Sequence, residues 1–148
     1  MTNESDDLHQ RIGIRLVGLA RRWRQALDAR LSSVGLSDAT WAPLMHLHER
    51  GGGISQSDLA AAVGLDGSSL VRLLDILVEQ ALIERRPHAV DRRVKLVHLT
   101  PAGRRTAASI RKRLQAIESE LLADVDDQDA QAMLRAFERI EARIAAQS

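Results

Sequence analysis

Cysteine is absent from this chain of 148 residues. Its absence excludes disulfides, thiolate metal ligands, cysteine nucleophiles and thiol redox sensing. Aromatic residues are scarce, since Trp23, Trp41 and Phe137 are the only three. No apolar run approaches the roughly 18 residues of a membrane helix, and the N-terminus, MTNESDDLHQ, is acidic and unlike a signal peptide. We therefore expect a cytoplasmic protein with no membrane partner.

Patterns typical of catalysis and metal binding are also missing. The sequence shows no catalytic set of serine, histidine and acid and no paired carboxylates. The glycines at 51–53 are not followed by Gly-Lys-Ser/Thr, so they do not form a phosphate loop. His46 and His48 would lie about 200° apart around a helix and cannot chelate one ion from one face. We expect no catalytic residue, no metal site, no cofactor and no enzyme activity.

Helical periodicity dominates what is present, and the 45% of hydrophobic residues suffices for one core. A long first helix, ending near Val34-Gly35, carries one apolar stripe, made of Ile12, Leu16, Leu19, Trp23, Leu27 and Leu31. Ser37 or Asp38 is expected to cap a second helix over Ala39–Arg50. A glycine loop over 51–53 then separates it from the next segment.

Two short helices follow, joined by a tight turn. Ser55 and Asp58 fit a capping box for the first helix, which Gly64 closes. Residues 66–69 can cap the second helix. Its apolar side comprises Leu70, Leu73, Leu74, Leu77 and Val78, and the opposite side presents Ser68, Ser69, Arg72 and Ile76. This arrangement predicts a helix-turn-helix.

The segment after these helices is strand-like and strongly basic. Leu82–Arg86 and Val94–Thr100 are predicted as two strands joined by residues 87–93, which makes the unit a winged helix. From Glu84 to Arg113 there are ten Lys or Arg residues against two acidic ones, a formal charge of +8. Like charges gathered this closely repel each other, so we expect a polyanionic partner.

Two further helices complete the chain. Thr100 and Pro101 should begin a long helix with a stripe formed by Ala107, Ile110, Leu114, Ile117, Leu121 and Val125. The acidic segment 126–129 is expected to begin a last helix, whose apolar stripe is formed by Met133, Phe137, Ile140 and Ile144. Because the central unit cannot cover all these apolar faces, we expect a homodimer. A monomeric bundle is the alternative.

In this order of elements the sequence resembles the MarR family of transcriptional regulators, from about Ile12 to Ile144. The most specific match is the family wing pattern, Asp-x-Arg followed by Leu-x-Leu-Thr and a nearby glycine, which is met by Asp91, Arg93, Val97, Leu99, Thr100 and Gly103. Val97 in place of leucine is the one departure. The stretches SSLVRLLDILVEQALIERR and WAPLMHLHE look similar to the SlyA branch.

The fold class expected is mainly α (α+β), a winged helix-turn-helix with N- and C-terminal helices that form a dimerisation region. Residues 36–100 would be the DNA-binding domain, and residues 1–35 and 101–148 the dimerisation region. In such proteins the second short helix enters the major groove and the wing reaches the minor groove. The resemblance therefore implies double-stranded DNA as a partner.

Each candidate contact has an expected role. Arg72 is the first choice for base reading, aided by Ser68 and Ser69, and Arg92 or Arg93 would enter the minor groove. Asp91 would support a neighbouring arginine without touching DNA. The phosphate-contact candidates are Ser55, Gln56, Arg85, Arg86 and Lys95.

The family also suggests an effector, since many relatives are released from DNA by aromatic carboxylates or phenolic compounds. Here Trp23 and Trp41 are candidates to line such a site, with Arg21, Arg22, Arg24, Met45 and Arg72 near them, although tryptophans are more often core residues. Two other functions stay open. A nonspecific or architectural DNA binder would need only the basic hairpin, and a helical module would present its arginines to an acidic protein.

Overall fold

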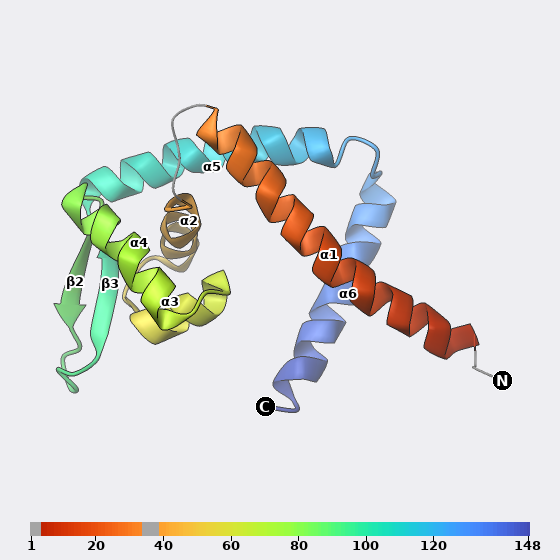
Figure 1. Ribbon diagram of the computed structural model, residues 1–148, viewed down its shortest axis with the longest axis horizontal. Helices are drawn as coiled ribbons and strands as arrows, with labels where there is room; N and C mark the ends of the chain where they lie inside the picture. The colour runs from red at the N-terminus through yellow and green to blue at the C-terminus, as the bar shows by residue number, and fades with distance from the viewer. Residues whose placement is uncertain (1–3, 34–38) are drawn as a thin grey trace. The chain divides into compact units, whose positions relative to one another are not determined.

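The computed structural model describes residues 4–33 and 39–148. Within them the chain is mainly helical, and it divides into two compact units, residues 1–114 and 115–148. The elements are α1 (Glu4–Ser32), α2 (Trp41–Arg50), β1 (Ile54–Ser55), α3 (Gln56–Val63), α4 (Gly67–Glu79), β2 (Ile83–Pro87), β3 (Lys95–Leu99), α5 (Pro101–Leu121) and α6 (Asp127–Ala145). This is the winged helix-turn-helix architecture that the sequence predicted (Figure 1).

The sheet is antiparallel with the strand order β1-β3-β2. β2 and β3 form the predicted hairpin, in register from Ile83 opposite Leu99 to Pro87 opposite Lys95. On the other side of β3, Ile54 pairs with Val97. The hairpin packs against α4 through β2 and projects beyond the helices (Figure 1). Its loop, residues 88–94, is therefore the outermost part of the wing.

The core of the first unit lies between the helix-turn-helix and the sheet. α3 packs on α2 and α4, and the sheet closes the layer behind them. Fully buried leucine and valine side chains come from α2, α3, α4 and β3: Leu44, Leu47, Leu59, Leu70, Leu74, Leu77 and Val97. Burying a leucine side chain stabilises a fold by about 2 kcal/mol, so this cluster fixes the position of α4 relative to the sheet.

Side-chain caps define where several helices begin. Ser55 accepts a hydrogen bond from the backbone N–H of Asp58 at the start of α3, and Asp66 and Asp126 cap α4 and α6 in the same way. Thr100 accepts from the N–H of Gly103 at 2.9 Å as α5 begins. These starts agree with the capping signals in the sequence.

The bounds of several elements and one face of α4 differ from the sequence-based expectations. α2 begins at Trp41 instead of Ala39, because Ala39 adopts a left-handed conformation with φ of 56°. β2 is shifted by one residue from the predicted 82–86, β3 is one residue shorter at each end than the predicted 94–100, and β1 was not predicted. Val78 was expected in the core but is 40% exposed, since at 100° per residue it lies at the edge of the α4 stripe. Val34-Gly35, the predicted end of the first helix, and the predicted cap at Ser37 or Asp38 lie outside the described residues.

Apolar side chains remain exposed on two helices. On α1, Leu27 and Leu31 are buried, whereas Ile12, Leu16 and Leu19 are 39–50% exposed. In the second unit, α6 has no buried residue. Its predicted stripe is exposed along its whole length, at Met133, Phe137, Ile140 and Ile144. No helix in the described part of the chain is long and apolar enough to cross a membrane.

Candidate nucleic-acid interface

The helix-turn-helix presents one polar face of α4. The turn between α3 and α4 begins at Gly64, whose φ of 73° suits a residue without a side chain. Because Leu70 and its apolar neighbours on α4 face the core, Ser68 and Arg72 are exposed and Ser69 is half-buried. Among the described residues, no hydrogen bond or ion pair occupies the Arg72 guanidinium. This face carries an unengaged donor fork of the kind that reads base edges.

Asp66 organises the N-terminal end of that face. Its Oδ1 atom accepts from the Ser68 hydroxyl at 2.6 Å and from the Ser69 backbone N–H at 2.8 Å, and its Oδ2 accepts from the Ser69 hydroxyl at 2.9 Å. These hydrogen bonds lower the pKa of Asp66 from 3.8 to about 2, and the bond from the Ser68 hydroxyl contributes most. The sequence pointed to Asp66 only as a helix cap, and its link to both serine side chains needed the structure.

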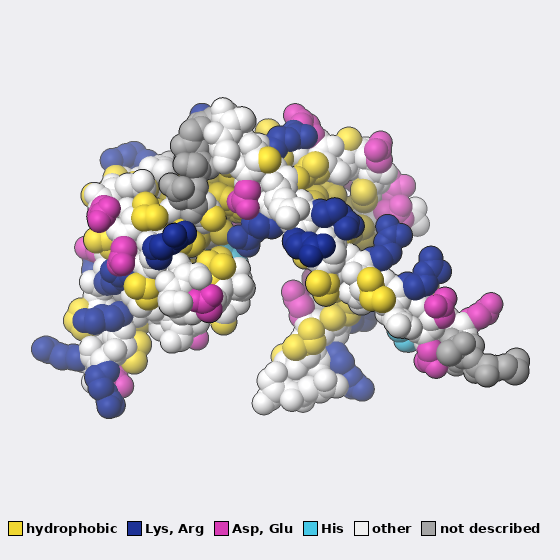
Figure 2. All heavy atoms as spheres, viewed as in Figure 1, with side chains coloured by type: hydrophobic (Ala, Val, Ile, Leu, Met, Phe, Trp, Pro, Cys, Tyr) yellow, Lys and Arg dark blue, Asp and Glu magenta, His cyan; other side chains and the backbone are white. Residues whose placement is uncertain are grey.

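The wing carries the exposed cations. Arg86, Arg92, Arg93 and Lys95 are all exposed, and Figure 2 shows Lys and Arg side chains gathered at the hairpin, at the lower left of that view. Arg86 also forms an ion pair with Glu84 on the same strand. The candidate minor-groove residues, Arg92 and Arg93, therefore lie in the projecting loop of the hairpin.

Local hydrogen bonds shape the loop of the wing. Asp91 accepts from the backbone N–H and the Nε of Arg93, both at 3.1 Å. These contacts lower the pKa of Asp91, and they place it in the supporting position expected for it. The His88 Nδ1 atom accepts from the N–H groups of Val90 and Asp91 at 3.1 and 3.2 Å. His88 thus holds the turn, a role that its sequence position did not indicate.

Arg85 differs from the other candidate phosphate contacts, because it is already engaged. Its guanidinium lies 2.8 Å from Asp75 of α4, and its side chain is only 26% exposed. Its Nε atom is buried and has no partner among the described residues. Arg85 therefore ties the wing to α4. Ser55 and Gln56, at the start of α3, are half-buried, and the Ser55 hydroxyl is used as the cap.

A hollow lies beside the same face, between α1 and α4. It has a volume of about 520 Å³ and is lined by Arg24, Ala39, Leu65, Ser68, Ser69, Arg72 and Leu73. Two arginines thus face one space. An anion fits beside them, because guanidinium groups bind carboxylates through paired hydrogen bonds.

Of the residues named from the sequence for an effector site, Arg24 and Arg72 line this hollow, whereas Arg21, Trp23, Trp41 and Met45 do not. Trp41 and Met45 are buried in the core, at 7% and 6% exposure, and the Trp41 indole N–H donates to Asp28 at 2.6 Å. Trp23 is half-buried and Arg21 is exposed. Trp41 approaches the hollow only through Arg24, whose guanidinium carbon lies 5.1 Å from the centroid of the ring.

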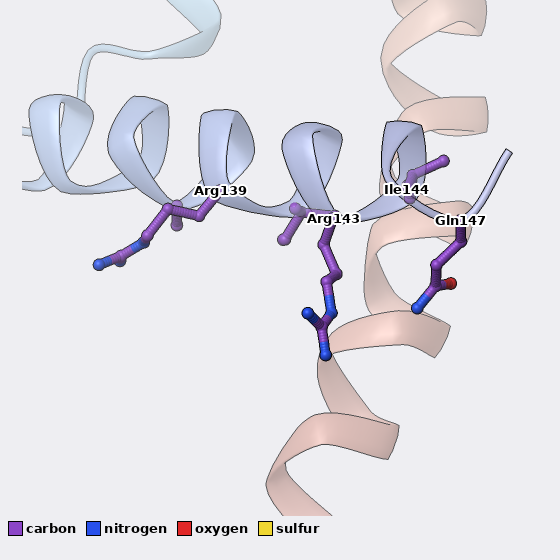
Figure 3. Close-up of a pocket in the computed structure, with 6 residues that line it drawn as sticks. Arg139, Arg143, Ile144 and Gln147 are labelled. Carbon is purple, nitrogen blue, oxygen red and sulfur yellow. The ribbon is translucent and has the colours of Figure 1, made fainter.

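A second, shallower hollow lies on α6 in the other unit. Its volume is about 410 Å³, and it is lined by Ala136, Arg139, Ile140, Arg143, Ile144 and Gln147. Figure 3 shows Arg139, Arg143 and Gln147 projecting from one side of the helix. No group of three or more potential metal ligands occurs among residues 4–33 and 39–148.

Comparison with known proteins gives a consistent picture. The sequence model of the MarR family matches residues 34–94. A solved structure of the transcriptional regulator PA3341 is 36% identical, with a TM-score of 0.80, and the match covers 91% of this chain and 98% of that one. CouR from Rhodococcus jostii RHA1, solved with p-coumaroyl-CoA bound, is 28% identical, with a TM-score of 0.72 and 95% coverage of both chains. A mutant MarR from E. coli complexed with operator DNA shares the fold at 22% identity and a TM-score of 0.71, over 87% of this chain and 92% of that one.

Proposed function

Since the chain belongs to the MarR family of transcriptional regulators, we propose that it binds a pseudo-palindromic operator as a homodimer and reads the sequence with α4. The observation that carries this proposal is the exposed face of α4, where Ser68 and Arg72 stand clear of the core beside a basic hairpin. A bidentate arginine contact to guanine gives about 1 to 3 kcal/mol of discrimination between bases. We assign that role to Arg72.

The wing supplies contacts of a different kind. Arg92 and Arg93 project from the loop of the hairpin, where they can enter the minor groove. Lys95 and Arg86 lie further back, where they can contact phosphates and set the position of the protein without reading sequence. In this assignment α4 gives specificity and the wing gives affinity.

The homodimer is supported by the apolar faces that the single chain leaves exposed. α6 buries no residue, and the N-terminal half of α1 exposes Ile12, Leu16 and Leu19. A second copy of the chain offers matching faces under two-fold symmetry. We therefore assign residues 1–35 and 101–148 to dimerisation and residues 36–100 to DNA binding. A symmetric dimer would place its two α4 helices in successive major grooves, about 34 Å apart.

The affinity ratio between a specific and a scrambled duplex tests this proposal. The specific duplex is selected from a random-sequence pool, and binding is measured by fluorescence anisotropy at two salt concentrations. We expect a preference of about a thousandfold or more for the selected duplex. Equal, steeply salt-dependent binding to both duplexes would instead identify a nonspecific, architectural DNA binder.

We further propose that a small aromatic carboxylate binds in the hollow between α1 and α4 and releases the protein from DNA. The hollow is supported as the site by Arg24 and Arg72, which can hold the carboxylate, and by its apolar residues Leu65 and Leu73. A ligand shared by α1 and α4 would fix one orientation of the DNA-binding unit, and release follows if that orientation spaces the two α4 helices wrongly.

Salicylate is the probe for this second proposal. Because Arg24 lies over Trp41, we expect salicylate to change the tryptophan fluorescence and to weaken DNA binding over the same concentration range. Arg24→Ala should weaken both responses, whereas Arg21→Ala, an exposed arginine on the same helix that does not line the hollow, should leave them intact. Salicylate that changes neither signal would refute the site.

A further inference from the structure

We propose that Asp66 determines which bases α4 accepts, because it holds the Ser68 and Ser69 hydroxyls as hydrogen-bond acceptors toward the DNA. This inference rests on the proposed function, since it concerns the same face of α4. It differs from that function in naming the chemistry of the base that is read.

The direction of the hydrogen bonds follows from the geometry. Asp66 contacts the Ser68 hydroxyl at 2.6 Å and the Ser69 hydroxyl at 2.9 Å, one through each of its oxygens. An ionised carboxylate has no proton to give, so each serine must be the donor in its bond. The pKa of about 2 keeps Asp66 ionised at neutral pH. Each hydroxyl has one proton, and both protons are therefore directed to Asp66.

The two serine hydroxyls can therefore offer another molecule only their oxygen lone pairs. Asp66 and Ser68 are exposed and Ser69 is half-buried, and both serines line the hollow together with Arg72. The N-terminal end of α4 is thus a patch of acceptors. One turn further along the same face, four residues after Ser68, Arg72 offers only donors.

This division predicts the bases. In the major groove, the exocyclic amino groups of cytosine and adenine are donors and match the serine oxygens, whereas guanine and thymine oxygens are acceptors and do not. Phosphate oxygens are acceptors as well, so Ser68 and Ser69 are unsuited to phosphate contacts. A half-site should therefore contain cytosine or adenine where the serines lie, next to the guanine read by Arg72.

Asp66→Asn is the test, because asparagine caps helices about as well as aspartate. The asparagine Oδ1 can still accept from the Ser69 N–H, but the side-chain NH2 group is a donor. A serine that accepts from this group is free to direct its own hydroxyl proton toward the DNA. Binding sites are selected from a random duplex pool with the full-length wild type, with Asp66→Asn and with Ser68→Ala/Ser69→Ala. Asp126→Asn is the matched control, because Asp126 caps α6 through an equivalent bond to the Asp129 N–H with no serine involved.

The wild-type pool should be enriched in cytosine or adenine at positions that lose their preference in the double serine variant. Asp66→Asn should reduce that preference by about tenfold while the guanine assigned to Arg72 stays enriched, and Asp126→Asn should select the wild-type motif. If Asp66→Asn selects the wild-type motif, or improves binding to all duplexes equally, Asp66 acts only as a cap or a charge, and the inference is wrong. A wild-type pool with no enriched motif would overturn the proposed function and, with it, this inference.

Discussion

Gly103→Ala should destabilise the protein, because the start of α5 lies too close to Leu82 to admit a side chain. A Cβ atom at position 103 would lie 1.8 Å from the carbonyl oxygen of Leu82 and 2.9 Å from its carbonyl carbon. Both are backbone atoms, so neither can rotate away as the end of a side chain can. The same Leu82 oxygen accepts a hydrogen bond from the Thr100 N–H at 3.1 Å. An alanine at this position must push apart the start of α5 and the segment that leads into β2.

The cost follows from the two contacts that change. Overpacking a tight site costs about 1 to 3 kcal/mol, and weakening the Thr100 bond to Leu82 adds about 1 kcal/mol. We expect the free energy of unfolding to fall by about 2 to 4 kcal/mol. For a chain of this length that corresponds to a decrease in Tm of about 5 to 15 °C.

Thermal and urea denaturation followed by circular dichroism measure this loss. Gly67→Ala is the matched control, because a Cβ at this first residue of α4 meets no atom within 4 Å. It should change stability by no more than about 1 kcal/mol. Equal effects of the two substitutions would refute the close approach of Gly103 to Leu82.

Three further predictions concern electrostatics and assembly. The pKa of Asp66 is lowered from 3.8 to about 2, so its stabilisation is fully present above pH 3.8 and is lost as the pH falls through 2. In urea titrations, any stability gap between wild type and Asp66→Asn should shrink over that range, and a gap at pH 2 as large as that at neutral pH would contradict this. Asp75→Asn breaks a partly exposed ion pair with Arg85. In urea denaturation the free energy of unfolding should fall by less than about 1 kcal/mol, and a much larger decrease would mean that the pair is more than a surface contact. Phe137→Asp puts a charge on the exposed stripe of α6 and should give monomers in analytical ultracentrifugation, whereas the exposed Arg135→Asp should not; a dimer that survives Phe137→Asp would exclude this face from the interface.

Most of the fold could be predicted because its signals are local. The helix-turn-helix is marked by Ser55 and Gly64 at the two ends of α3, and α4 follows from four leucines at helical spacing. The wing is visible as β-branched residues between charges. Periodicity and caps depend on residues within one or two turns, so they can be read from a single chain.

The differences arise where distant residues decide the structure. β1 has only two residues, and it exists as a strand because Ile54 pairs with Val97, far along the chain. The late start of α2 reflects the left-handed backbone of Ala39, a conformation that alanine seldom adopts and that no sequence pattern signals.

The candidate site shows the same division. Arg72 and the wing arginines could be named from sequence because their positions relative to a helix or hairpin identify them. The ion pair of Arg85 with Asp75 and the hollow beside α4 depend on tertiary contacts, whereas the role of His88 depends on the backbone conformation of the wing loop. Of the residues named from the sequence for an effector site, Arg24 and Arg72 line this hollow, whereas Trp41 and Met45 lie in the core.

The affinities of three proteins for two duplexes test the central claim most directly, namely that α4 reads sequence while the wing holds the backbone. Wild type, Arg72→Ala and Lys95→Ala are compared on the selected and the scrambled duplex by fluorescence anisotropy. Arg72→Ala should weaken binding to the selected duplex by about 5- to 150-fold and leave the scrambled duplex nearly unchanged. Lys95→Ala should weaken both to a similar extent and reduce the salt dependence. If Arg72→Ala weakened both duplexes equally, α4 would not be reading the sequence, and the account would be wrong.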